Sequence, residues 1–180
     1  MVRVLTAALL VVATPLSAQT SAAPPPAVAE LRAVDSPAQN DMTYLQNARE
    51  SGSYEVASSR LALQRSRNRQ IKAFGQMMIN HHTRSVAELA RLQGTRGASL
   101  ADGGSEPKAQ MLDKLRSSAR AEFDMNYVQG QLAAHEEALA LHRIYAATGQ
   151  NAALRQFAQR ASALVQDHLS RARTLPRSPR

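Results

Sequence analysis

The sequence predicts an all-α protein built as a four-helix bundle, and two observations support this. The apolar residues of the 180-residue chain are largely Ala and Leu, there is no Trp, and β-branched runs are scarce after the first dozen residues. Such a composition favours helices over strands. Apolar side chains also recur every three or four residues along four long segments, which is the period of an amphipathic helix. Since most of these segments are joined by short links, we expect them to pack as a bundle.

The first 39 residues are expected to lie outside the bundle. Residues 1–18 carry one early charge, Arg3, then an apolar run from Val4 to Val12, and they end in small residues. The run is too short to span a bilayer and is typical of a secretory signal peptide, cut after Ala18 or, as second choice, after Ala23. It predicts an exported protein, in the periplasm or associated with the outer membrane. Residues 19–39 are rich in Ala and Pro and predict a disordered tether.

The bundle domain is expected over residues 40–176, and it opens with two long helices. The first is predicted to begin at Asn40 or Asp41, either of which can cap it, and to end near Ser66. The second is predicted from Asn68 to about Gln93. Their inward stripes are Leu45, Ala48, Gly52, Val56, Ser59 and Leu63 in the first helix, and Ile71, Gly75, Met78, His82, Val86 and Leu89 in the second.

A long connection and two more long helices complete the domain. Gly94 to Pro107 is rich in Gly and polar residues and predicts a loop, which either a crossover or a surface excursion would fit. A short extra helix is expected over Lys108 to Ser117. The third and fourth long helices are predicted over Ser118 to Ala147 and from Asn151 to Leu175. Residues 177–180 are expected to form a frayed tail.

Composition limits the classes of partner. The formal net charge is +8, but the basic residues are mostly Arg scattered among acidic ones, and no basic run forms a patch. Mixed solvated helix faces are therefore expected, with no nucleic-acid partner. A partner in the cell envelope or at a membrane surface stays open, as does the oligomeric state. The absence of Cys excludes disulfides and thiolate metal sites.

Histidines interrupt the inward stripes of three predicted helices. They are His82, His135 and His168, and each lies on a different helix. A neutral imidazole in a core loses about 1–3 kcal/mol for each nitrogen left without a hydrogen bond, so three of them are easier to explain if they meet. Glu55 on the first helix could complete a ring with one ligand from each helix. Imidazole and carboxylate ligands suit Zn, Cu or Fe, so we expect one transition-metal ion.

Four further residues are candidates for contact with these ligands: Met78, His81, Asp124 and His142. Each has an ordinary alternative. Met78 is equally suited to filling the core, and His81 and His142 could lie on solvated faces. Asp124 shares a helix face with His135, so it could orient an imidazole or cap a helix turn.

Several chemistries are disfavoured by the motifs. A di-iron centre of the ferritin type needs paired Glu-x-x-His motifs, whereas Glu136 and Glu137 directly follow His135 and do not share its face. Nucleophile elbows, phosphate-binding Gly loops and zincin His-Glu pairs are also missing from the sequence. No catalytic residue is predicted. Three hypotheses remain, in this order: a metal-binding module, a non-enzymatic envelope interaction or stress module with structural histidines, and an oxidoreductase with a mononuclear site.

Short motifs in both halves of the domain follow a known family. The first half has Tyr44-Leu45-Gln46-Asn47-Ala48, Glu55-Val56-Ala57, Leu61-Ala62-Leu63, and Lys72 to Met78 with His82-Thr83. The second half has Glu122-Phe123-Asp124, Tyr127-Val128, His135, Ala138-Leu139 and His168-Leu169. Together they make residues 41–175 resemble the bacterial family known as domain of unknown function 4142.

This resemblance implies a ferritin-like fold and an exported or outer-membrane protein. It also implies that the family's characteristic polar positions are occupied here by Glu55, His82, Asp124, His135 and His168. Members usually carry an acidic pair before the histidine of the second helix, where this chain has Asn80-His81. The resemblance implies no reaction.

Overall fold

The computed structural model describes residues 37–94 and 105–176. Within these residues the chain forms five α-helices and no strand, which confirms the prediction of an all-α protein with a short extra helix. The helices are α2 (Pro37–Arg65), α3 (Arg69–Leu92), α4 (Glu106–Ser117), α5 (Arg120–Thr148) and α6 (Ala152–Thr174). No helix in the described part of the chain is long and apolar enough to cross a membrane.

The helix ends follow the predicted caps closely, with one difference at the start. Asn68 caps α3 by accepting from the backbone N–H of Gln70 at 2.9 Å, and Asn151 caps α6 by accepting from that of Ala153 at 3.0 Å. Helix α2 begins at Pro37, before the expected caps, so residues 37–39 of the predicted tether are helical. Proline fits the first helical turn because its missing N–H would have no partner there. The predicted signal peptide, the rest of the tether and the tail lie outside the described residues.

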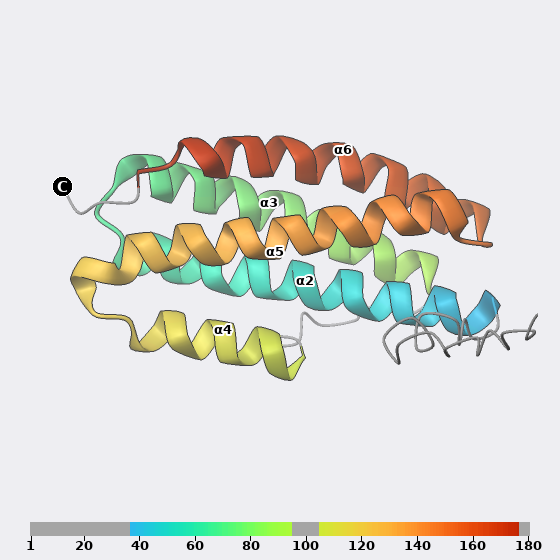
Figure 1. The fold of residues 1–180 in the computed structure, drawn as a ribbon, viewed down its shortest axis with the longest axis horizontal. Helices are drawn as coiled ribbons and strands as arrows, with labels where there is room; N and C mark the ends of the chain where they lie inside the picture. Colours follow the sequence, from blue (N-terminus) through green and yellow to red (C-terminus); the bar gives the residue numbers. More distant parts are fainter. Residues whose placement is uncertain (1–36, 95–104, 177–180) are drawn as a thin grey trace, which may run out of the picture. The chain divides into compact units, whose positions relative to one another are not determined.

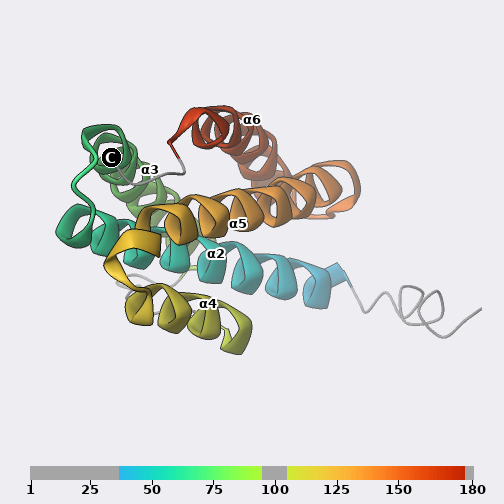
Figure 2. The ribbon, with the colours of Figure 1, turned by 60° about the vertical axis from the view of Figure 1, so that its left-hand side comes forward.

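The four long helices pack so that each contacts two others in antiparallel fashion (Figures 1 and 2). Helices α2 and α3 form one pair, and α5 and α6 form the other. Contacts between α2 and α5, and between α3 and α6, join the two pairs. Because both α3 and α5 run antiparallel to α2, they run in the same direction.

The connection between α3 and α5 is a crossover. Helix α3 ends beside the first half of α2, where Arg49 Nη1 lies 2.9 Å from Gln93 Oε1. Helix α5 starts at the opposite end of α2, where the Arg65 guanidinium lies 4.5 Å from the Phe123 ring. The chain must therefore travel the length of the helices between these points, and α4 forms the last part of that return (Figure 1).

Helix α4 is fastened to α2 and α5 by a few specific contacts. Arg65 donates to the carbonyls of Leu115 at 2.9 Å and Arg116 at 2.6 Å, which lie at the end of α4 where carbonyls lack helical partners. At the other end, the buried Lys108 ammonium lies 2.5 Å from Glu137 of α5 and over the Tyr54 ring of α2. These contacts place α4 outside the four long helices.

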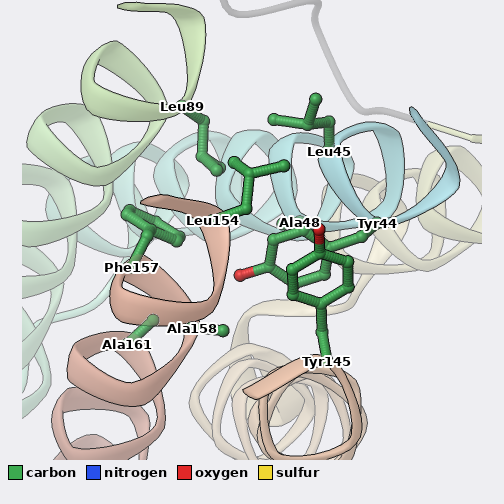
Figure 3. Close-up of a cluster of buried hydrophobic side chains, with 9 residues drawn as sticks. All are labelled: Tyr44, Leu45, Ala48, Leu89, Tyr145, Leu154, Phe157, Ala158 and Ala161. Carbon is green, nitrogen blue, oxygen red and sulfur yellow. The ribbon is translucent and has the colours of Figure 1, made fainter. Parts of the chain in front are cut away.

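Two apolar clusters lie on either side of a polar layer in the core. This layer is formed by the buried side chains of Glu55, His82, His135 and His168. One cluster lies where α2 and α6 begin and α5 ends, and it stacks the Tyr44 and Tyr145 rings at 3.8 Å (Figure 3). Its members are Tyr44, Leu45, Ala48, Leu89, Tyr145, Leu154, Phe157, Ala158 and Ala161. The second cluster, at the other end, includes Ile71, Phe74, Met78, Phe123, Tyr127 and Val128. Burial of each large apolar side chain stabilises the fold by about 1.5–3 kcal/mol, so both ends hold the layer between them in place.

Candidate metal centre

Three buried histidines meet in the polar layer. His82 comes from α3, His135 from α5 and His168 from α6, and one ring nitrogen of each lies within 4.8 Å of the other two. His135 and His168 are completely buried, and His82 is 5% exposed. The sequence predicted this meeting, because each histidine interrupts an inward stripe and buried imidazoles need partners for their nitrogens.

His82 is held by Glu55 of α2. The Nδ1 of His82 lies 2.7 Å from the carboxylate Oε2 of Glu55, and both side chains are buried. A carboxylate accepts hydrogen bonds, so His82 donates Nδ1–H, and in the neutral ring the lone pair is on Nε2. Among the described residues this Nε2 has no hydrogen-bond partner. A buried nitrogen left unpaired in this way is a metal-ligand candidate.

His135 is oriented by its own helix. Its Nδ1 lies 2.7 Å from the backbone carbonyl of Gln131, one turn earlier in α5. Since a carbonyl oxygen can only accept, the proton of His135 is on Nδ1 and the lone pair is on Nε2. That Nε2 lies 3.4 Å from Nδ1 of His168. The backbone bond thus fixes the tautomer of His135 that leaves Nε2 free to bind a metal ion.

His168 is paired on its other side with His81. The Nε2 of His168 lies 2.8 Å from Nδ1 of His81, which is half-buried, and the two rings stack at 5.1 Å. When His168 donates Nε2–H to His81, lone pairs of His168 Nδ1 and His135 Nε2 face each other, and a cation between them would relieve their repulsion. In the opposite proton arrangement His81 donates, and His168 Nδ1–H points at His135.

Electrostatics favour neutral His135 and His168 beside an ionised Glu55 carboxylate. Burial lowers the pKa of His135, and burial with the neighbouring imidazoles of His82 and His135 lowers the pKa of His168 to about 2. Burial alone would raise the pKa of Glu55, but His82 and His135 outweigh it and bring this pKa down to about 2. A metal ion binds the neutral form of imidazole. At neutral pH, protons therefore compete little with a metal ion for the ring nitrogens of His135 and His168.

One of the three pairs of ligand nitrogens has the spacing that a tetrahedral ion requires, and all three nitrogens lie within 4.8 Å of one another. Metal–nitrogen bonds of about 2.0–2.1 Å at tetrahedral angles put two ligand nitrogens about 3.3 Å apart. The observed distance between His135 Nε2 and His168 Nδ1 is 3.4 Å. Three neutral imidazoles suit Zn, Cu and Fe, which are the metals predicted from the sequence.

Glu55 differs from its predicted place. Glu55 was predicted to be one of four ligands, whereas the three nitrogens that converge belong to the histidines alone. Its Oε2 is engaged by His82, and its Oε1 lies 3.4 Å from Nδ1 of His135, behind the ligand nitrogen of that ring. The structure therefore places Glu55 behind the imidazoles, where a carboxylate orients a histidine and raises its basicity.

Two of the remaining candidates lie beside the polar layer. Met78 belongs to the apolar cluster and is completely buried, which matches its alternative role as core filler. His142 lies on the opposite side, with Nδ1 3.0 Å from the Tyr44 hydroxyl and its ring edge-on to Phe157. His142 is therefore buried but separate from the three converging histidines.

Asp124 belongs to a different part of the molecule. It lines a pocket of about 560 Å³ beside the link between α2 and α3 and the start of α5. The pocket is also lined by arginines, among them Arg67, Arg69 and Arg120. Asp124 is eleven residues before His135, or about 16 Å along a helix at 1.5 Å per residue, so orientation of that imidazole is excluded.

The polar residues that support the layer were not predicted from the sequence. Gln131 supplies the carbonyl for His135, and its side-chain Nε2 donates to Ser58 Oγ at 2.9 Å. Ser58 and the nearby Ser51 are both buried in α2. Several serines gather around Glu55 in the sequence, which was a usable signal. The carbonyl of Gln131 left no signal, because every residue has one.

The fold and the site define an all-helical protein with three converging buried histidines that could hold a metal ion. Residues 25–175 match the family model described as "Domain of unknown function (DUF4142)", so the chain belongs to this family. The resemblance noted in the sequence is thereby confirmed. Comparison with curated proteins and with solved structures gives no match.

Proposed function

We propose that the protein binds one transition-metal ion, Zn, Cu or Fe, through His82, His135 and His168. The observation that carries the proposal is that the two nitrogens of each imidazole ring have different surroundings. One nitrogen of each imidazole has an outer partner: the Glu55 carboxylate, the Gln131 carbonyl or His81. The other nitrogen faces the centre. Metal-bound histidines have this arrangement, because the outer hydrogen bond fixes the tautomer and the ring orientation.

The rival proposal is that the histidines are structural and that the protein acts through a partner in the envelope. It accounts for His135 and His168, since a chain of hydrogen bonds from His81 could satisfy both rings. It does not account for His82, whose Nε2 is buried and has no partner among the described residues. An unmet buried nitrogen costs about 1–3 kcal/mol, and a metal ion would remove that cost.

We also propose that the scaffold is a four-helix bundle of the ferritin-like type. The support is the parallel course of α3 and α5 with one long crossover between them, which is the connectivity of ferritin-like bundles. Such bundles hold metal ions on side chains that project inward from facing helices. The ligand set differs from a di-iron centre, because the paired Glu-x-x-His motifs are missing from the sequence.

Export to the periplasm or outer membrane is proposed from the leader sequence. Support comes from the apolar run Val4 to Val12 and the small residues up to Ala18. The N-terminal sequence of protein recovered from bacterial periplasm should begin at Gln19. Protein that keeps Met1 and stays in the cytoplasm would contradict this proposal.

Metal titration of purified, chelator-treated protein tests the metal site. We expect one Zn²⁺ or Co²⁺ per chain. The His82→Gln variant should lose more than the roughly 100-fold in affinity that loss of an outer-shell partner costs, because it removes a ligand. The matched control is His142→Gln, which changes another buried helical histidine whose nitrogens are not among the three that converge, and it should leave affinity within about threefold. Equal losses in both variants, or no binding by the unmodified protein, would refute the proposal.

A further inference from the structure

A pocket lined by arginines lies at the end of the bundle where α2 passes into α3 and α5 begins. Its volume is about 560 Å³, within the range of about 300–1,000 Å³ that is usual for small-molecule sites. The wall contains Arg65, Arg67, Arg69 and Arg120, and its one acidic residue is Asp124. Because Arg120 is far from the other three arginines in the sequence, the fold and not a basic run brings these charges together.

Three of the four guanidinium groups have no role in holding the fold together. Arg65 donates to carbonyls at the end of α4, so its role is structural. The side chains of Arg67, Arg69 and Arg120 are exposed and form no hydrogen bond or ion pair with any described residue. Asp124 is half-buried and is likewise without an ion pair among these residues. Charged groups of both signs in this pocket are therefore available to a ligand.

Two of the free arginines lie where a helix disfavours positive charge. Arg69 is the first residue of α3, whose first turn has no acidic residue, and Arg120 is the first residue of α5. A helix N-terminus favours an anion by about 0.3–1 kcal/mol and disfavours a cation. The Asn68 side chain already accepts from the N–H groups of Gln70 and Ile71, so the backbone at the start of α3 is occupied. An anion in the pocket would therefore be held by the guanidinium groups, and it would offset an unfavourable arrangement of charge.

We propose that this pocket binds a small soluble phosphomonoester that also carries hydroxyl groups. A guanidinium group matches phosphate oxygens by donating two parallel N–H···O bonds. The three free arginines and Asp124 give +3 and −1, hence a charge of +2. This balances a phosphomonoester, with about −1.5 to −2 at pH 7, better than it balances the single charge of a carboxylate. The Asp124 carboxylate can only accept, so it would bind hydroxyl hydrogens of the ligand. The pocket is separate from the three histidines, and the proposal does not depend on the metal site.

The test is calorimetric titration of the full mature chain with glycerol 3-phosphate, inorganic phosphate and lactate. The protein is first stripped of metal and dialysed free of chelator, so that phosphate cannot bind a metal ion. The salt concentration is about 0.15 M, at which charges more than about 8 Å apart are largely screened. We expect one glycerol 3-phosphate per chain, bound more tightly than phosphate and at least about tenfold more tightly than lactate. Absence of saturable binding, or equal binding of lactate, overturns the proposal. Binding to phosphatidic acid vesicles without binding to glycerol 3-phosphate also overturns it.

A matched pair of variants on α5 locates the phosphate. Arg120 and Arg143 are both exposed, but Arg143 lies near the other end of the helix, 3.0 Å from Gln166 of α6. Arg120→Gln removes a charged hydrogen-bond donor and should weaken glycerol 3-phosphate binding about tenfold or more. Arg143→Gln removes the same charge and should change binding less than about twofold. Equal losses would show general charge attraction and overturn the proposal. Thermal unfolding without ligand should be no lower in Arg120→Gln than in the unmodified protein, since this side chain has no partner in the fold.

The variant Asp124→Ala tests the contact with the hydroxyl groups. Removal of the negative charge should strengthen the binding of inorganic phosphate, because like charges no longer repel. The preference for glycerol 3-phosphate over phosphate should disappear, because the acceptor for its hydroxyl groups is gone. An unchanged preference overturns the assignment of the hydroxyl groups to Asp124. Zinc affinity should be the same in Asp124→Ala and Arg120→Gln as in the unmodified protein, so failure of this proposal leaves the metal site standing.

Discussion

The Nδ1 of His82 lies 2.7 Å from Oε2 of Glu55, and these two side chains are 7% and 1% exposed. A fully ionised carboxylate so deep in a core needs compensation, since burial of an unpaired charge is strongly unfavourable. Contact with His82 supplies part of it, and a cation held on the far side of the ring would supply more. Glu55, His82 and the proposed ion thus form a carboxylate–histidine–metal series of a kind seen in many metal sites.

Glu55→Gln should weaken metal binding without abolishing it. The amide oxygen can still accept from His82 Nδ1, but the negative charge is lost, so we expect affinity for Zn²⁺ to fall about 10–100-fold. Glu50→Gln is the control on the same helix, because Glu50 is half-buried and its carboxylate accepts from Gln46. Competition with a chromophoric chelator measures both. An unchanged affinity in Glu55→Gln would contradict the role assigned to this carboxylate.

Stability of the metal-free protein should fall as the pH drops from about 6.5 to about 4 because of His142. Burial lowers the pKa of His142 to about 4; Glu55 raises this pKa and His82 lowers it, both with smaller effects than burial. The unfolded chain has the ordinary value of about 6.5 and takes up the proton first, so the contribution is complete above pH 6.5 and lost near pH 4. The loss from this one group is about 3 kcal/mol at most.

Urea unfolding at several pH values, in the presence of a chelator, measures this effect. His142→Gln keeps an acceptor for Tyr44 but cannot titrate, so its free energy of unfolding should depend less steeply on pH over this range. His135 and His168 have lowered pKa values too and should leave a residual slope in the variant. Identical slopes in the two proteins would show that His142 does not contribute.

Arg65→Met should release α4 while the four long helices stay folded. The substitution removes the bonds to the carbonyls of Leu115 and Arg116, and it should cost about 1–3 kcal/mol. Hydrogen exchange should become faster in Glu106–Ser117 and stay slow in α5. The control Arg67→Met changes an exposed arginine two residues away. Equal exchange in α4 of both variants would argue against the fastening role of Arg65.

Met78→Leu should leave the metal affinity unchanged. Met78 packs with Ile71, Phe74 and Tyr127 in an apolar cluster, so a substitution of similar volume should cost less than about 1.5 kcal/mol of stability. Titration with Cu⁺ is the sharpest measurement, since thioether sulfur is a good ligand for that ion. A large loss of Cu⁺ affinity would mean that Met78 binds the ion after all.

The helices and the three inward histidines could be predicted because they depend on local patterns. Asn68 and Asn151 cap helices through contacts two or three residues away, and His82, His135 and His168 each replace an apolar residue in a period that the sequence displays. Such signals need no knowledge of the neighbouring helices.

The rest of the site depends on how the helices pack. Glu55 was predicted as a ligand. Its distance from the point where the three imidazoles converge depends on the position of α2 relative to α3, and the apolar period of a sequence gives no information on that position. Asp124 shares a face of α5 with His135, yet its distance along the helix puts it in another pocket. The hydrogen bond from His135 to the Gln131 carbonyl depends on a side-chain rotamer.

The most direct test of the metal site is anomalous diffraction from crystals of the protein grown with Zn²⁺. We expect one strong zinc peak per chain, about 2.0–2.1 Å from Nε2 of His82, Nε2 of His135 and Nδ1 of His168. The site would be refuted if the three imidazoles showed no anomalous peak between them while zinc was bound only at surface side chains.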